Sequence, residues 1–326
     1  MDFDLKFDHR EPEGSFSLQQ VELALDAIND VPKVLRAEPL AGGYSHINYR
    51  LDTVDGTFVM RVSNKGEREF DAEIAILDRL AESIPLPRVI WSKKNVKSVN
   101  RHIAILNFVN GDLLSKVEDG LEEAEIRTIA SQLGRILAKI HSVTFEKSGF
   151  FDGSLTITEA FPSFTVGYID YMQSLPHSQR VATRLTPSTL SKLKTYMIEN
   201  SAISKMLKLT SQLTHSDFNQ KNIMVNKVKG EWKVTAILDW EFAYSGCPLG
   251  DFGNFFRYPE MNPHYKQPFV EAYRKSGGHL PGNWEEKARY LDILPMLQFL
   301  DKDEDLPNTF ETARSVINHT LSLYMD

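Results

Sequence analysis

The stretch that decides the fold is residues 213–225, LTHSDFNQKNIMV, in which an acid and an amide stand just ahead of an apolar run. A second apolar run ends at Asp239, and Lys229 and Gly230 between the two runs are typical of a tight turn. The pattern therefore predicts a β-hairpin. Because the first strand of a hairpin starts where the second one ends, we expect Asn222 and Asp239 to be neighbours in space.

Three oxygen-bearing side chains then meet at one end of this hairpin. Asp217 precedes the first strand and is expected at the same end of the hairpin as Asn222 and Asp239. Carboxylate and amide oxygens are ligands that Mg²⁺ takes, and the ion keeps room for phosphate oxygens. Phosphoryl transfer needs metal-bound phosphates and a carboxylate that orients the acceptor hydroxyl and accepts its proton. The sequence therefore predicts transfer of phosphate from a nucleoside triphosphate to a small molecule.

The same residues resemble a known family. The pattern H-x-D-x-x-x-x-N from His215 to Asn222, followed by an apolar strand pair and Asp-Trp-Glu from Asp239, resembles the signature of aminoglycoside phosphotransferases and the related choline-kinase-like small-molecule kinases. This resemblance implies a protein-kinase-like fold, ATP or GTP as the phosphate donor and Mg²⁺ as a cofactor. It also implies that Asp217 is the catalytic base and that Asn222 and Asp239 are the magnesium ligands.

The resemblance extends to residues around these three. It implies that His215 braces the catalytic loop, and Asp251, in the sequence PLGD, matches a family acid that helps to hold the C-terminal lobe. Ser216 stands where the family commonly has glycine. Trp240 and Phe242 are expected to pack rather than to contact a ligand, and the role of the glutamate between them is left open.

Strand-like and helix-like periodicities are segregated along the chain. Alternation typical of strands occupies residues 34–62, and another apolar run follows at 103–106. Residues 67–82 have the spacing of a helix. The apolar face of this predicted helix consists of Phe70, Ile74, Leu77 and Leu80.

The rest of the chain is predicted to be mainly helical. A long helix is expected over residues 122–141, and residues 160–210 are expected to be helical with interruptions at prolines. No strand is expected from the end of the long helix to the hairpin described above. The fold class is therefore α+β, with a small β-rich nucleotide-binding lobe at 1–106, a hinge at 107–111 and a larger, mainly helical catalytic and substrate-binding lobe at 112–326.

A chain that transfers phosphate also needs groups that hold the nucleotide. The turn at Gly42 and Gly43 could bring backbone N–H groups and the Ser45 hydroxyl to the triphosphate, although such a pair is more often plain turn chemistry. Alternation places Arg61 on the strand face opposite Phe58, where it could look into the cleft. Many family members have lysine at this position. The forked guanidinium of Arg61 is expected to contact phosphate with a different geometry from that of a lysine ammonium.

The resemblance pairs this basic residue with an acid on the next helix. Glu73 lies at the edge of the apolar face and is preferred as this acid over Glu69, one turn earlier. The alternative is that Glu73 is only a solvated charge on an amphipathic helix and pairs with no basic residue. The segment from Asn107 to Gly111 matches the family's lobe connection, whose main chain hydrogen-bonds the nucleotide base. Asn107 and Val109 are therefore expected to contribute to nucleotide binding.

Composition narrows the class of protein. The 326 residues include 37 Lys and Arg against 44 Asp and Glu, a net charge of −7, which argues against a nucleic-acid partner held by phosphate contacts. The single cysteine, Cys247, favours a reducing compartment and is expected to be inert. No stretch approaches the roughly 18 apolar residues of a membrane span. We therefore expect a cytoplasmic protein with no membrane partner, and the oligomeric state stays open.

The acceptor is not determined by these patterns. A hydroxylated small molecule such as an aminoglycoside or an amino alcohol is expected, and the acid-rich residues 301–305 could hold a polyamine or be solvated surface. A non-catalytic nucleotide-binding scaffold is one alternative. A metal-dependent phosphohydrolase built on His215 and Asp217 is another, but the nine histidines are scattered along the chain.

Overall fold

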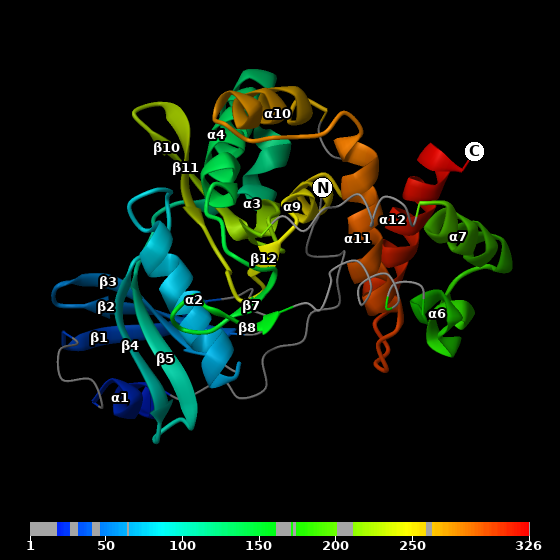
Figure 1. Ribbon diagram of the computed structural model, residues 1–326. Helices are drawn as coiled ribbons and strands as arrows, with labels where there is room; N and C mark the ends of the chain where they lie inside the picture. The colour runs from blue at the N-terminus through cyan, green and yellow to red at the C-terminus, as the bar shows by residue number, and fades with distance from the viewer. Residues whose placement is uncertain are drawn as a thin grey trace.

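A computed structural model describes residues 18–26, 32–40, 46–63, 65–160, 171, 174–200, 211–258 and 263–325 (Figure 1). The glycine pair at 42 and 43 and Ser45, expected at the nucleotide phosphates, lie outside the described residues. Within the described residues the chain divides into a β-rich N-terminal part and a mainly helical C-terminal part, so the predicted α+β class is confirmed.

The N-terminal part is a five-stranded antiparallel sheet with the order β1-β2-β3-β5-β4. Its strands are β1 (Val34–Leu40), β2 (His46–Thr53), β3 (Gly56–Ser63), β4 (Val89–Val96) and β5 (Arg101–Asn107). One face of the sheet packs with α1 (Leu18–Asp26) in a small apolar cluster, and the other joins the main core with α2 (Glu67–Leu80). Alternation therefore sends the odd and even side chains of each strand to different cores.

The expected strands at 34–62 and 103–106 and the helix at 67–82 are confirmed. Two details differ. Ile74 is only partly buried, whereas Ile76 lies in the core. Strand β4 was not predicted, because its centre is the polar run Ser92-Lys93-Lys94-Asn95, and its burial pattern shows no clean alternation.

The C-terminal part is built around α4 (Glu123–His141) and α10 (Lys266–Lys275), which pack closely side by side. A Cβ atom on Gly134 of α4 would lie 2.2 Å from the Phe269 carbonyl oxygen, so glycine allows this close approach. The other helices are α3 (Leu114–Val117), α6 (Gln179–Arg184), α7 (Pro187–Glu199), α9 (Leu249–Phe255), α11 (Trp284–Leu300) and α12 (Pro307–Tyr324), with 3₁₀ turns at Glu118–Gly120, Leu175–His177 and Gln220–Asn222.

Two small sheets lie between the main sheet and these helices. One has the order β11-β10-β6, and the other has the order β8-β7-β12-β9. Their strands are β6 (Asp112–Leu113), β7 (Gly149–Phe151), β8 (Ile157–Ala160), β9 (Gln212–Thr214), β10 (Ile223–Val228), β11 (Glu231–Ile237) and β12 (Tyr244–Gly246). The expectation of no strand between the long helix and the hairpin is therefore wrong. Strands β7 and β8 are too short to show alternation and form only by pairing with each other and β12.

The predicted hairpin is formed by β10 and β11. Ile223 pairs with Ile237, and Lys229 and Gly230 between the strands have φ values of 52° and 85°. Two successive left-handed residues give the turn that matches the twist of a tight hairpin. Among the described residues, no helix is long and apolar enough to cross a membrane.

Candidate active site

Asp217 lies in the loop between β9 and β10, where two amides hold its carboxylate. Asn219 Nδ2 donates to Asp217 Oδ1 at 2.7 Å, and Asn222 Nδ2 donates to Asp217 Oδ2 at 2.7 Å. Each oxygen keeps a second lone pair that can accept from another donor. The carboxylate is therefore fixed in orientation and still able to accept a hydrogen bond from a substrate hydroxyl.

The start of this loop is anchored by Asp251 of α9, which is fully buried. Its carboxylate accepts from the main-chain N–H of His215 at 2.9 Å and of Ser216 at 2.7 Å. His141 Nε2 donates to the same carboxylate at 3.0 Å, from the end of α4. The aspartate thus joins the loop to two helices, which agrees with the structural role expected for it.

His215 braces the loop from inside. Its Nδ1 accepts from the Asp217 N–H at 3.2 Å, so its Nε2 carries the proton and donates to the Leu238 carbonyl oxygen at 2.9 Å. Burial lowers the pKa of His215, with the nearby carboxylate of Asp251 opposing that shift. A neutral imidazole therefore links the loop before β10 to the end of β11.

Ser216 has a φ of 71°, in the left-handed region that favours glycine. The left-handed conformation explains why the family commonly has glycine at this position. The loop turns here and directs two successive N–H groups at Asp251. Ser216 adopts this conformation at some cost in strain.

Asp239 follows β11 and is also left-handed, with a φ of 65°. The Leu238 N–H donates to the Asn222 carbonyl oxygen at 2.8 Å, which brings Asp239 beside Asn222 as the hairpin argument predicts. Burial raises the pKa of Asp239 to about 7, and repulsion from Glu241 adds to the shift. A buried carboxylate in a strained conformation is typical of a functional position.

This corner fits a hard cation. Asp239 Oδ1 is buried and accepts no hydrogen bond from a described residue. The side-chain amide of Asn222 uses its nitrogen to bind Asp217, and its oxygen forms no hydrogen bond within the described part of the chain. Carboxylate and amide oxygens without another partner are the donor type that Mg²⁺ binds.

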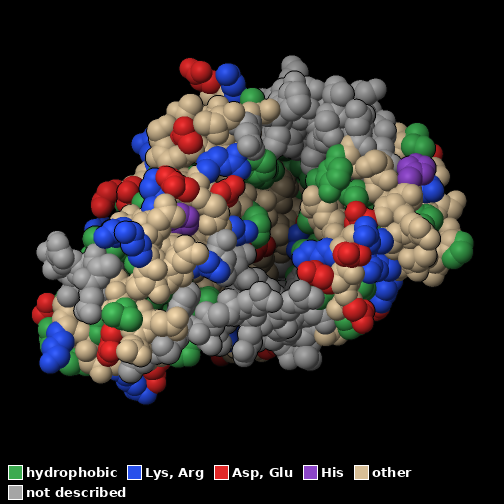
Figure 2. Space-filling view, turned by 90° about the horizontal axis from the view of Figure 1, so that it is seen from below, with side chains coloured by type: hydrophobic (Ala, Val, Ile, Leu, Met, Phe, Trp, Pro, Cys, Tyr) green, Lys and Arg blue, Asp and Glu red, His purple; other side chains and the backbone are tan. Residues whose placement is uncertain are grey.

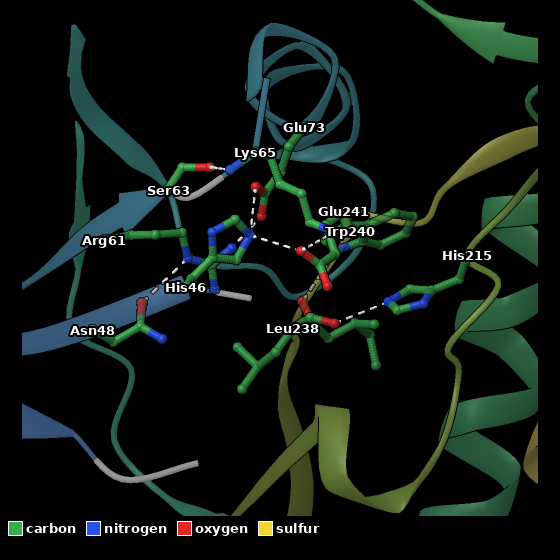
Figure 3. Close-up of polar contacts among 11 residues, drawn as sticks. His46, Asn48, Arg61, Ser63, Lys65, Glu73, His215, Leu238, Trp240 and Glu241 are labelled. Atoms are coloured by element: carbon green, nitrogen blue, oxygen red, sulfur yellow. Dashed lines mark hydrogen bonds and ion pairs between the residues drawn. The ribbon is translucent and has the colours of Figure 1, made fainter. Parts of the chain in front are cut away.

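Arg61 and Glu73 form a buried ion pair between β3 and α2 (Figure 3). Arg61 Nε also donates to Asn48 Oδ1 at 3.3 Å on the neighbouring strand. Glu69, the alternative partner, instead binds Arg68 at 2.8 Å. The preference for Glu73 therefore agrees with the structure, and the guanidinium lies on the side of the sheet that faces α2.

Three ionisable side chains near this pair were given no role from the sequence: His46, Lys65 and Glu241. His46 Nε2 lies 3.2 Å from Glu241 Oε2 and 3.5 Å from Glu73 Oε2, and Lys65 Nζ lies 3.5 Å from Glu241 Oε2. Figure 3 shows these side chains gathered from β2, the loop before α2 and the loop after β11. The position of His46, three residues after Gly43, was the available signal.

Trp240 and Phe242 flank Glu241 and behave differently. Trp240 is buried against the ring of His215, so the expected packing role is confirmed. Phe242 is 47% exposed and lies under the Lys65 ammonium at 4.7 Å, so the expectation of a packing role is wrong for it. Strand alternation fails beyond β11 because the chain leaves the sheet there.

The connection between the two parts begins at Asn107. The Asn107 N–H donates to the Arg88 carbonyl oxygen at 3.0 Å, and its side chain accepts from the Arg88 N–H, so both of these groups are already used. Val109 forms no hydrogen bond with any other described residue. A Cβ on Gly111 would lie 2.4 Å from the Val225 carbonyl oxygen, so the connection ends where it passes close to β10.

The acid-rich residues 301–305 end α11 and contact α6. Asp303 binds Arg180 at 2.8 Å, and Arg184 Nη1 donates to the Lys302 carbonyl oxygen at 2.6 Å. Figure 2 shows acidic and basic side chains interspersed on the face seen from below. Asp303 is thus matched by an arginine and the main chain of the run is held by Arg184, which favours the interpretation as ordinary surface.

An antiparallel sheet joined to a helical part, with the loop carrying Asp217 and a hairpin ending at Asp239, is the protein-kinase-like fold. Residues 36–289 match the model of the phosphotransferase enzyme family. The chain belongs to this family, and the resemblance seen in its sequence is confirmed.

Solved structures share the fold. Aminoglycoside 2′-phosphotransferase-IIIa in its GDP complex has a TM-score of 0.74 and 14% identity, covering 94% of this chain and 98% of that chain. Aminoglycoside phosphotransferase APH(4)-Ia has a TM-score of 0.69 and 15% identity, covering 94% and 99% respectively.

A curated relative is much longer. Acyl-CoA dehydrogenase family member 11 of Rattus norvegicus is 23% identical over 271 residues, which are 77% of this chain and 33% of the relative. The chain therefore spans about a third of the length of the curated relative it matches.

Proposed function

We propose that the chain is a kinase that transfers the γ-phosphate of ATP or GTP to a hydroxyl of a small molecule with the help of Mg²⁺. The observation that carries this proposal is the arrangement of Asp217, Asn222 and Asp239 at one end of the β10–β11 hairpin. Family membership and the nucleotide complexes of structural neighbours, with ADP or GDP, support it.

In this proposal Asp217 is the catalytic base. Its carboxylate, held by two amides, would accept a hydrogen bond from the acceptor hydroxyl and take its proton as the oxygen attacks the phosphate. Asn222 and Asp239 would hold Mg²⁺ through oxygens that have no other partner among the described residues. The bound ion would neutralise charge on the phosphates.

The nucleotide would lie between the two parts of the chain. We propose lobes at 1–106 and 112–326 with a hinge at 107–111, and a phosphate contact from Arg61, oriented by Glu73. Val109 is the better candidate for contact with the base, since the Asn107 N–H is engaged. Ser45 stays a proposed phosphate contact from the sequence alone.

Substitution of the proposed base provides the direct test. Asp217→Ala should abolish phosphate transfer while the nucleotide still binds, measured by product formation and by calorimetry on the same preparation. Full turnover in the variant would refute the assignment. Nucleotide binding without turnover in the unmodified chain, across all acceptors, would instead support the non-catalytic scaffold.

The metal assignment has a separate test. Asn222→Ala and Asp239→Ala should each weaken nucleotide affinity only when Mg²⁺ is present, because the ion joins them to the phosphates. The same Mg²⁺ dependence in the variants as in the wild type would contradict the assignment. Asn226, on β10 beyond the site, offers a matched control as Asn226→Ala.

The acceptor is proposed only as a class. Hygromycin B and kanamycin are bound in structural neighbours, which supports a hydroxylated small molecule such as an aminoglycoside or an amino alcohol. A screen of nucleotide consumption over aminoglycosides, amino alcohols, sugars and nucleosides would identify it.

A further inference from the structure

Three side chains of types that bind metal ions, from two separate segments, converge beside the proposed magnesium site. His46 opens β2, and Asp239 and Glu241 follow β11. One ligand atom from each of these residues lies within 4.8 Å of the other two. Figure 3 shows the His46 ring and the Glu241 carboxylate facing each other.

His46 is poorly satisfied where it lies. The residue is 3% exposed, and neither ring nitrogen makes a hydrogen bond with a described residue. Its Nε2 faces Glu241 Oε2 at 3.2 Å without the geometry of a hydrogen bond. Asp239 Oδ1 is also buried and without a donor in the described part of the chain. Buried polar atoms without partners are costly, so their convergence indicates a missing positive group.

The charges lead to the same conclusion. The guanidinium of Arg61 pairs with Glu73, and Lys65 Nζ lies 3.5 Å from Glu241. Asp239 forms no ion pair within 4 Å in the described part of the chain. A divalent cation would supply the positive charge that no ion pair among the described residues gives Asp239.

We propose that His46, Asp239 and Glu241 form a second cation site, which binds a transition-metal ion such as Mn²⁺, Co²⁺ or Zn²⁺ in the nucleotide-free protein. Imidazole nitrogen suits these ions, whereas Mg²⁺ prefers sites made only of oxygen. Ligand atoms about 2.1 Å from a tetrahedral ion are about 3.4 Å apart. His46 Nε2 and Glu241 Oε2 already lie 3.2 Å apart, and all three ligand atoms lie within 4.8 Å of one another, so the side chains need to close by at most about 1.4 Å.

This site does not depend on the proposed kinase activity, but it shares Asp239 with the proposed magnesium site. A transition-metal ion held there would use the same carboxylate as a magnesium ion bound by Asn222, which directly precedes β10. Binding of the two ions is therefore expected to be coupled through Asp239.

The test uses the full chain, freed of metal by a chelator and without nucleotide. Titration with Co²⁺, followed by visible absorption and calorimetry, should give one ion per chain, and excess Mg²⁺ should not displace it. His46→Ala and Glu241→Gln should each weaken Co²⁺ binding at least tenfold. The exposed His264, paired with Glu123, provides the matched control His264→Ala, which should bind Co²⁺ as the wild type does.

A second measurement needs no variant. Pulsed electron paramagnetic resonance of Mn²⁺ bound to the wild-type chain should detect coupling to one histidine nitrogen. Absence of that coupling, absence of stoichiometric Co²⁺ binding, or equal Co²⁺ affinity in a folded His46→Ala variant would each overturn the proposal. Asn222→Ala separates the two sites, because it should leave Co²⁺ binding intact. Loss of Mg²⁺-dependent nucleotide binding alone would bear only on the proposed function.

Discussion

Replacing Asp251 with alanine should destabilise the chain strongly, because this carboxylate is the buried acceptor that holds the loop carrying Asp217. It accepts from the N–H groups of His215 and Ser216 and from His141 Nε2 at 2.7 to 3.0 Å, and its exposure is 0%. Each buried donor left without a partner costs about 1–2 kcal/mol, so the expected loss in the free energy of unfolding is about 3–6 kcal/mol.

Asp251→Asn is a more conservative change, which removes fewer of the hydrogen bonds to this side chain. An asparagine can keep its oxygen at the Oδ2 position, where His141 and the His215 N–H donate, and it loses only the bond from the Ser216 N–H. The expected loss is then about 1–3 kcal/mol, with turnover reduced because the loop that carries Asp217 is less well fixed.

Urea unfolding followed by tryptophan fluorescence would measure both variants of Asp251. Asp152 provides a matched control, since it also accepts three hydrogen bonds, from Ser154 N, Ser154 Oγ and Thr156 N, but at a solvent-accessible turn. Asp152→Asn should therefore cost much less than Asp251→Asn. A loss below about 1 kcal/mol for Asp251→Ala would refute the account of the loop anchor.

Three further predictions concern the backbone and the charge of the site. Because burial and Glu241 raise the folded pKa of Asp239 from 3.8 to about 7, the metal-free chain should lose stability, on the order of a few kcal/mol, as pH rises from about 4 to 7. Asp239→Asn should remove that slope in pH-dependent urea unfolding, and an unchanged slope would contradict the shift. Ser216→Gly should leave the unfolding free energy within about 1 kcal/mol of the wild type, because relief of left-handed strain offsets the entropy of glycine; a loss above about 2 kcal/mol would show that no strain is present. Gly111→Ala should lower the free energy of unfolding by about 2–3 kcal/mol, because the φ of Gly111 is 141° and the new Cβ would lie 2.4 Å from the Val225 carbonyl oxygen. A thermal unfolding midpoint equal to that of the wild type would argue against this close contact.

Local patterns were sufficient for much of the fold. The spacing of Asp217, Asn222 and Asp239 around two apolar runs predicts the hairpin and the meeting of Asn222 with Asp239, because a tight turn places the two strand ends together. Helix periodicity likewise placed Glu73 at the edge of the buried face of α2. Short strands such as β7 and β8 were not predicted, because three or four residues show no measurable alternation.

The sequence by itself therefore determined the family, the hairpin that ends at Asp239 and most of the longer strands and helices, since these depend on neighbours within one hairpin or one helix. Only the tertiary structure decided that His46, Lys65 and Glu241 meet around Asp239. These contacts join β2, the loop before α2 and the loop after β11, which are far apart in the chain. No periodicity in the sequence predicts these contacts, because they follow from how the sheet packs against the helical part.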